Sequence, residues 1–330
     1  MAKIKVGIIG LGVGLKHYEA YKHSNLSQVV AIIDYDKKKF EKIKKKNKNI
    51  KYFQNSKDLI NNKDIDLVSI ASYDDDHYNQ ILECIKNKKN IFVEKPICTT
   101  EKQLEAIAKA YKESRSEDGK GPVLMVGFNR RFSSLTQLVK KDLMKINSPK
   151  AFTLTCNAGY LDKNHWTNDF EVGGGRLIGE ACHFLDLIMY LAESKIKDLN
   201  IDFSKDEKVC PDTFSLNVEF EDGSIGNINY FSNGSKKFQK ERLEVFAGGR
   251  IYQIQNFQKL KVWGSSNLKS VRKLTQDKGQ KSCIELFIDS IKNAKETPIP
   301  FEDIYEVQKW LLLANKKNCS RDYVFDPYKS

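Results

Sequence analysis

Three glycines near the start of the chain have a spacing that could bind a phosphate. Gly10, Gly12 and Gly14 follow the apolar run Ile4–Ile9. Glycine permits a tight turn and a close approach of the backbone to a pyrophosphate, and a following helix would offer the free N–H groups of its first turn. The usual pattern has its third glycine where Leu15 stands, so the turn alone is weak evidence for a phosphate site.

An aspartate follows at the distance expected in a dinucleotide site. The run Val29–Ile33 ends at Asp34, which is 22 residues after Gly12, close to the roughly 20 residues that separate the turn from a ribose-binding carboxylate. A carboxylate there would accept hydrogen bonds from both ribose hydroxyls and repel a 2′-phosphate, which favours NAD over NADP. The alternative is that the acidic cluster only caps the next helix, a role that Asp36 could take alone.

A lysine is placed where it could bind a reacting oxygen. Lys95 follows the predicted strand Asn90–Val93 and is fixed by Pro96, so it would point from the carboxyl end of that strand toward a bound nicotinamide. Taken alone, Lys95 is better explained as a surface residue before a helix that Thr99 or Thr100 would cap.

A glutamate and a histidine share one flank of a predicted helix that begins after the glycines at 173–175. Glu180 and His183 are three residues apart and can face one cavity together. Without other evidence such a histidine is more often a satisfied helix residue, but beside a lysine and a nicotinamide it becomes a general acid or base. His17, His23 and His165 have no partner at metal-binding spacing, so no metal site is predicted.

The elements that would carry these residues in the first half alternate between strand and helix. Near-continuous apolar strands that alternate with helices predict a parallel, doubly wound sheet with its site at the carboxyl ends of the strands. The predicted strands are Ile4–Ile9, Val29–Ile33, Asp66–Ala71, Asn90–Val93 and Val123–Val126, and the predicted helices span about 15–24, 36–46, 77–88 and 101–114.

The pattern changes after Gly121-Pro122, where apolar and polar residues begin to alternate. This alternation predicts an antiparallel sheet with one buried face. The predicted strands are Ala151–Cys156, Asp212–Phe220, Ser224–Phe231, Arg242–Ala247 and Ile251–Gln255, with a hairpin turn at 221–223 and closing helices at Ser282–Asn293 and Phe301–Lys316.

Composition limits the class of protein. A chain of 330 residues with 40% hydrophobic residues predicts two folded domains. Seven scattered cysteines indicate reduced thiols in the cytoplasm. No apolar run is long enough for a membrane span, and the glycine-rich start argues against a secretory leader. The net charge of +12 is spread along solvated faces such as the lysine-rich run from Lys37, so it favours anionic ligands rather than a nucleic acid.

Five stretches, taken together and in this order, resemble the Gfo/Idh/MocA oxidoreductases, the family of glucose–fructose oxidoreductase and inositol dehydrogenase. The resemblance implies an α/β + α+β fold: a Rossmann NAD-binding domain, expected over residues 1–124, and a domain with an open, mostly antiparallel sheet for substrate binding and oligomerisation, expected over 125–330. The stretches are GLGVGLKH, SIASYDDDH, VEKPICTT, VGFNRRF and GGGRLIGEACHFLDL.

The resemblance also implies roles for individual residues. Lys95 would bind the reacting oxygen, and His183 would be the acid–base group. Gly179 stands where the family often has an aspartate, and the neighbouring Glu180 could substitute for it; Tyr73 and Asp74 stand where the family often has proline and asparagine. The implied cofactor contacts are Gly10, Gly12, Val13, Gly14, Asp34, Ser72, His77, Glu94, Lys95 and Pro96. The implied substrate contacts are Lys95, Asn129, Arg130, Glu180 and His183.

The sequence therefore predicts a cytoplasmic, NAD-dependent dehydrogenase. We expect it to act on a secondary alcohol of a sugar, a nucleotide-linked sugar or a cyclitol, and to form a homodimer or homotetramer without nucleic-acid or membrane partners. One alternative is a non-catalytic dinucleotide-sensing regulator on the same scaffold, which would need Gly12 and Asp34 but not Lys95 together with His183. The other is a nucleic-acid binder, whose affinity would fall steeply with salt.

Overall fold

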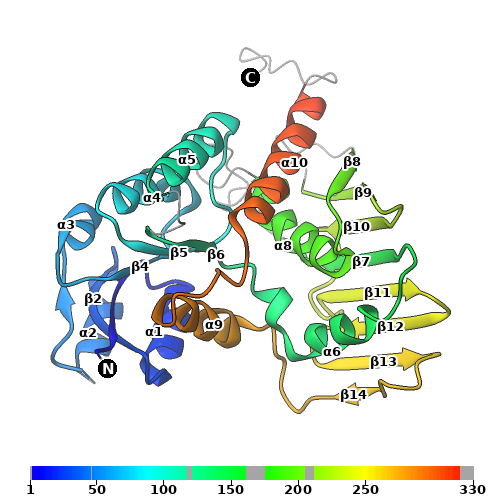
Figure 1. The fold of residues 1–330 in the computed structure, drawn as a ribbon, viewed down its shortest axis with the longest axis horizontal. Helices are drawn as coiled ribbons and strands as arrows, with labels where there is room; N and C mark the ends of the chain where they lie inside the picture. Colours follow the sequence, from blue (N-terminus) through cyan, green and yellow to red (C-terminus); the bar gives the residue numbers. More distant parts are fainter. Residues whose placement is uncertain (1, 46, 117–120, 161–174, 205–211, 320–330) are drawn as a thin grey trace. The chain divides into compact units, whose positions relative to one another are not determined.

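The computed structural model describes residues 2–45, 47–116, 121–160, 175–204 and 212–319 (Figure 1). The chain forms two compact units. The first consists of Met1–Thr136 and Asp277–Tyr305, and the second of Gln137–Gln276 and Glu306–Ser330. The sequence predicts one boundary after residue 124, whereas compact packing divides the chain after 136, 276 and 305. The functional roles expected of the two domains stay predictions.

Residues Asp277–Tyr305 belong to the first unit because they pack against its helices and sheet. Helix α9 (Gln280–Lys292) packs on α1 (Gly14–His23), and the rings of Phe287 and Phe92 lie 5.8 Å apart between their centroids. The sequence predicts a helix here, over Ser282–Asn293, but nothing in its local pattern shows which surface the helix will cover.

The first unit contains a six-stranded sheet in the order β3-β2-β1-β4-β5-β6, and all its neighbouring strands are parallel. In Figure 1, α4 and α5 cover one face of this sheet, and α1 and α9 cover the other. The predicted doubly wound sheet is therefore confirmed. The strands are β1 (Ile4–Ile9), β2 (Ser27–Ile33), β3 (Lys51–Tyr52), β4 (Leu67–Ile70), β5 (Asn90–Val93) and β6 (Leu124–Val126). The other helices are α2 (Lys37–Lys44), α3 (Ser56–Asn61), α4 (His77–Lys86) and α5 (Glu101–Glu113), with short 3₁₀ turns η1 (Asp74–Asp76) and η2 (Asn129–Phe132).

Local sequence explains most of these elements. Every residue of β4 and β6 is buried, as expected of strands covered on both faces. Asp36 caps α2 by accepting a hydrogen bond from the Lys38 amide, and Thr100 forms a capping box with Gln103 at the start of α5. β3 and α3 were not predicted, because two and six residues are too few to show a period.

The second unit contains an eight-stranded sheet in the order β14-β13-β12-β11-β7-β10-β9-β8. All its neighbouring strands are antiparallel except β7 and β10, which are parallel. The strands are β7 (Ala151–Asn157), β8 (Ile196–Phe203), β9 (Phe214–Phe220), β10 (Ile225–Phe231), β11 (Glu241–Ala247), β12 (Arg250–Gln255), β13 (Lys259–Trp263) and β14 (Val271–Arg272). The five predicted strands and the hairpin turn between β9 and β10 are confirmed. The strands missed are β13 and the two edge strands, whose alternation is weak because less of their surface is buried.

One face of this sheet is covered by α8 (Gly175–Ala192). Gly226 on β10 permits the contact, since a Cβ there would lie 2.8 Å from Cδ1 of Ile188. In the sequence, Leu177, Ala181, Phe184, Ile188 and Leu191 recur at helical spacing and predict one apolar stripe. In the structure nearly every residue of α8 is buried, with Glu180 and Tyr190 half-buried. In the part of the chain that the structure describes, no helix has the length and apolarity needed to cross a membrane.

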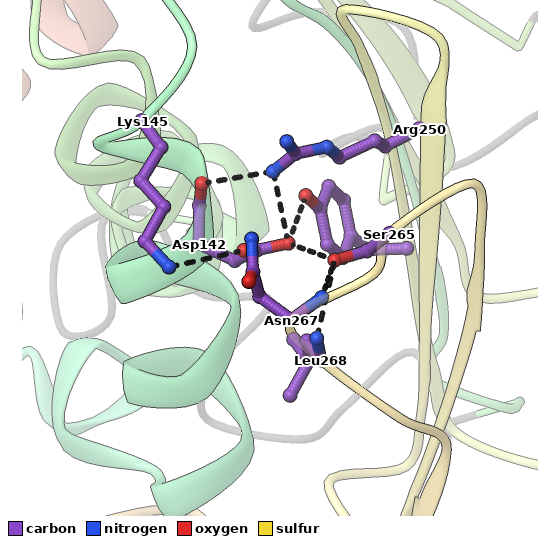
Figure 2. Close-up of polar contacts among 7 residues, drawn as sticks. Asp142, Lys145, Arg250, Ser265, Asn267 and Leu268 are labelled. Atoms are coloured by element: carbon purple, nitrogen blue, oxygen red, sulfur yellow. Dashed lines mark hydrogen bonds and ion pairs between the residues drawn. The ribbon is translucent and has the colours of Figure 1, made fainter.

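A buried carboxylate joins α6 (Ser134–Leu143) to the far strands of the same sheet (Figure 2). Asp142 accepts hydrogen bonds of 2.7 Å from the hydroxyls of Tyr252 and Ser265. A nitrogen of Arg250 lies 3.2 Å from the same carboxylate oxygen, and Lys145 lies 3.9 Å from the other. Burial alone would raise the pKa of Asp142, but these hydroxyls and cations together lower it.

Candidate active site

The glycine turn connects β1 to α1 and leaves room for a ligand. Gly10 has φ of +85°, and a Cβ there would lie 2.2 Å from the carbonyl oxygen of Ala71, so only glycine fits. A Cβ on Gly12 would meet nothing within 4 Å. Val13 is the N-cap of α1 and makes no side-chain hydrogen bond. The Lys16 amide donates to the Val13 carbonyl at 2.8 Å, which leaves the amides of Gly14 and Leu15 at the start of the helix for a phosphate.

Asp34 lies directly beside this turn, at the end of β2. Its carboxylate accepts hydrogen bonds from the amides of Leu11 and Asp36, and Lys39 lies 3.9 Å away. Because Asp36 caps α2 by itself, Asp34 is not needed as a helix cap. The open space at Gly12 and the carboxylate at Asp34 together fit a dinucleotide whose pyrophosphate follows the turn and whose ribose reaches the acid.

Glu94, at the end of β5, is positioned by a histidine that the sequence analysis did not place in the site. His17 on α1 has Nε2 at 2.9 Å from Oε1 of Glu94 and Nδ1 at 3.0 Å from the hydroxyl of Ser69 on β4. Burial would raise the pKa of Glu94, but the hydrogen bond and charge of His17, with the charges of Lys95 and His77, lower it.

His77 holds the loop that contains Lys95. Its Nδ1 lies 2.7 Å from the carbonyl oxygen of Pro96, which can only accept, so Nδ1 carries the proton. Burial lowers the pKa of His77, and the Pro96 carbonyl and Glu94 oppose that shift. Ser72, at the end of β4, donates a 2.9 Å hydrogen bond to Gln80.

The predicted cofactor residues thus gather at one edge of the first sheet. They follow β1, β2, β4 and β5, whose carboxyl ends meet there. Asn129 and Arg130 lie in η2. Asn129 is buried, donates to the carbonyl of Lys278 at 2.7 Å and accepts from Arg130 at 3.1 Å. These contacts explain a structural role for Asn129, and its substrate role stays a prediction.

The remaining predicted residues lie on α8 of the second unit. His183 is 5% exposed and Glu180 is half-buried; three residues apart, they share one face of the helix. The same face carries two buried charged residues that the sequence analysis missed, Arg176 and Asp186. Arg176 lies seven residues before His183 and Asp186 three residues after it, and this helical spacing could have placed both on the His183 face.

Two other predictions concern residues that are not fully described. His165 and the glycines at 173 and 174 lie outside the described residues. Within the described ranges, no group of three or more histidine, cysteine, aspartate or glutamate side chains could hold a metal ion.

Comparison with known proteins agrees with this geometry. Residues 4–119 match the oxidoreductase family with an NAD-binding Rossmann fold, and residues 145–248 match the GFO/IDH/MocA C-terminal domain. The chain belongs to the Gfo/Idh/MocA family of oxidoreductases. Several relatives are named dehydrogenases, and the protein is an NAD-dependent oxidoreductase that acts on CH–OH groups.

Individual relatives are distant. Myo-inositol 2-dehydrogenase of Thermotoga maritima is 26% identical over 260 residues, which cover 76% of this chain and 75% of that protein. A solved levoglucosan dehydrogenase in complex with NADH and L-sorbose superposes with a TM-score of 0.82 at 19% identity, covering 96% of this chain and 98% of that one. The WlbA dehydrogenase of Bordetella pertussis, in complex with NADH and UDP-GlcNAcA, superposes with a TM-score of 0.80 at 17% identity, covering 97% of both chains. At these identities the two structures show a shared fold.

Proposed function

We propose that the protein transfers a hydride between NAD and a secondary alcohol of a sugar, a nucleotide-linked sugar or a cyclitol. The observation that carries the proposal is the shared edge of the first sheet. There the open glycine turn follows β1 and Asp34 follows the adjacent β2, and β4 alone separates β1 from β5, after which Glu94 and Lys95 come. The names of the inositol dehydrogenase relatives support a polyhydroxylated substrate.

The residues of the chain would divide the work. Gly10, Gly12, Val13, Gly14 and Asp34 would hold NAD, which when bound supplies the hydride acceptor. Lys95 would bind the substrate oxygen and stabilise the negative charge that develops on it. His183 would take the hydroxyl proton. Glu180 would orient His183 or a neighbouring hydroxyl.

Cofactor binding can be tested without knowing the substrate. Gly12→Val adds a branched side chain to space that the fold leaves open, so the variant should fold but lose NADH binding. A titration by protein fluorescence measures the loss, and thermal unfolding verifies the fold. A folded variant that still binds NADH would show that the turn does not hold the pyrophosphate.

Catalysis is tested by a panel of sugars, nucleotide sugars and cyclitols with NAD, followed by NADH absorbance. On the substrate found, His183→Asn should lower the rate about 10²- to 10⁴-fold, the usual contribution of a positioned general base. Lys95→Met should lose comparable activity while NADH binding changes little. A Glu180→Gln loss as large as that of His183→Asn would make Glu180 the base. Near-full activity of His183→Asn would overturn this mechanism.

The face of the second sheet opposite α8, here called the open face, supports the expected homo-oligomer because it carries exposed apolar side chains. Register places one apolar row across five neighbouring strands of this face, and three of its members are about half exposed: Trp263 48%, Phe246 43% and Ile225 57%. A hollow of about 550 Å³ adjoins the row. Such a surface is a liability unless another molecule covers it. The row runs Trp263, Ile251, Phe246, Ala151 and Ile225.

We expect light scattering to show a dimer or tetramer at micromolar concentration. Phe246→Lys should dissociate it, because a charge in the middle of the apolar row cannot be buried cheaply. Glu219→Lys, on the same face of β9 and paired with Ile225 at the end of the row, is the matched control and should leave the oligomer largely intact. A wild-type monomer would contradict the proposal.

A further inference from the structure

Arg176 is a buried cation that the proposed mechanism does not use. It is the second residue of α8 and is 7% exposed. One guanidinium nitrogen, Nη1, donates a 2.8 Å hydrogen bond to the hydroxyl of Tyr230 on β10. The other two, Nε and Nη2, are shielded from solvent and have no hydrogen-bond acceptor. Among the described residues, no carboxylate lies within the 4.0 Å of an ion pair with Arg176.

No described carboxylate forms an ion pair with Arg176, although Glu180 lies one turn further along the helix and its charge acts on the neighbouring Tyr230. A guanidinium stays protonated in proteins, and burying an unpaired cation is costly. Burial raises the pKa of Tyr230, and the charge of Glu180 raises it further against the opposing effect of Arg176, so the phenol remains neutral. The first turn of α8 contains no acidic residue, and a helix N-terminus is itself partly positive.

The unpaired nitrogens also have a defined shape. Nε and Nη2 form the side of the guanidinium whose two parallel N–H groups match a carboxylate or phosphate in a bidentate pair. They belong to the first turn of an 18-residue helix, and the partly positive N-terminal end of a helix favours an anion as well. Both features select the same chemistry, an oxyanion.

The position of Arg176 relates this oxyanion to the proposed acid–base residue. Arg176, Glu180 and His183 follow one another at four and three residues, so they lie along one face of α8. Seven residues correspond to about 10 Å along a helix. A group bound at Arg176 would therefore lie about one sugar ring and its substituent away from a carbon that reacts beside His183.

We infer that Arg176 binds a carboxylate or phosphate of the substrate, so that the protein acts on an anionic sugar. This inference rests on the dehydrogenase function proposed above and narrows its substrate class. Glu180 is spaced to accept hydroxyls of the ring between the oxyanion and the reacting carbon.

Direct binding tests the site without cofactor or turnover. Glucose, glucuronate and glucose 6-phosphate are added separately at millimolar concentration, and thermal unfolding of the full chain is followed. We expect glucuronate or glucose 6-phosphate, but not glucose, to raise the Tm by several degrees, and the probe that acts distinguishes carboxylate from phosphate. Arg176→Met should abolish the shift, and Arg176→Lys should keep only part of it because lysine lacks the bidentate fork.

A matched variant separates this site from general charge. Arg242→Met makes the same change on the open face of β11, where Arg242 lies 3.7 Å from Glu244, and should keep the full anion response. Without ligand, Arg176→Met should unfold within a few degrees of wild type, since removal of a buried cation that has no ion-pair partner offsets the loss of its hydrogen bond to Tyr230. The inference would be wrong if Arg176→Met lowered the Tm strongly while Arg176→Lys kept the full rise in Tm with the anion. Arg176 would then be a structural residue.

Kinetics then separates the inference from the proposed function. The ratio of kcat/KM for an anionic sugar to that for its neutral counterpart should fall about 10²-fold in Arg176→Met, as expected when one partner of a buried charge pair is removed. If the protein oxidises neutral sugars and anionic sugars change neither its Tm nor its kcat/KM, the anionic site is refuted and the dehydrogenase function is kept. An anion shift that depends on Arg176, with no oxidation of any sugar, would refute the dehydrogenase and leave the site standing.

Discussion

His17 and Glu94 connect the glycine turn to the loop after β5 through a 2.9 Å contact between Nε2 and Oε1. His17 belongs to the helix that starts at the glycine turn, and Glu94 immediately precedes Lys95. The helix that would receive the pyrophosphate therefore also holds the carboxylate next to the lysine. A shift of α1 would move both groups together.

The first prediction removes this contact while keeping the ring. His17→Phe preserves the edge contact with Phe92, whose ring centroid lies 5.1 Å away, but it removes the contacts of His17 with the partly buried Glu94 and the buried Ser69 hydroxyl. An unsatisfied buried acceptor costs about 1–3 kcal/mol, so the free energy of unfolding in urea should fall by that amount. His23→Phe, an exposed site on the same helix, is the control and should change stability little. Equal stability of both variants would show that the contact contributes nothing.

The second prediction concerns His77 and pH. Burial lowers the pKa of His77 below its ordinary 6.5, so below about pH 6.5 the unfolded chain binds the proton more readily than the folded one. The stabilisation from neutral His77 is fully present above that pH and is lost as the pH falls from 6.5 toward the folded pKa. The Tm should drop between pH 7 and pH 5, and His77→Asn, which keeps a donor for Pro96, should flatten that drop. A parallel pH profile in the variant would show that His77 does not titrate in this range.

The third prediction concerns Asp142, whose pKa is lowered in the folded state. Its stabilisation should be present above about pH 4 and disappear as the pH falls through the folded pKa. At pH 7, Asp142→Asn should lower the free energy of unfolding by about 1.5–3 kcal/mol, the range for hydrogen bonds to a charged group. Lys145→Met removes only a half-exposed partner at 3.9 Å and should cost less than about 0.5 kcal/mol. Urea unfolding at pH 7 measures both variants.

The parts that the sequence predicts well depend on local pattern. Continuous apolar runs identify the parallel strands because both faces are buried, and Gly12 and Asp34 keep a fixed spacing because one helix and one strand, α1 and β2, separate them. The contacts that complete the sites are long-range. His17 and Glu94 are 77 residues apart, and Arg176 and Tyr230 are 54 apart. No local period relates such residues, and a histidine or arginine on an apolar helix face gives no sign of its partner.

The last prediction concerns the choice between NADH and NADPH. Asp34 faces the glycine turn with its negative charge, and the ammonium group of Lys39 lies 3.9 Å from it. Wild-type protein should bind NADH more tightly than NADPH, because the carboxylate would repel a 2′-phosphate. Asp34→Ser should weaken NADH binding about 10- to 100-fold through lost charged hydrogen bonds and should strengthen NADPH binding, since Lys39 is then free to attract the phosphate.

Two further variants test why Asp34→Ser changes the cofactor preference, with NADH and NADPH affinities measured by fluorescence titration. Asp36→Ser alters the neighbouring acid but keeps a helix cap, because serine caps nearly as well as aspartate, so its preference should remain that of wild type. Adding Lys39→Met to Asp34→Ser should remove the gain in NADPH affinity and leave the NADH loss unchanged. If wild type binds both cofactors equally, or if Asp34→Ser and Asp36→Ser behave alike, Asp34 does not read the ribose, and the carboxylate serves only to fix the amide of Leu11.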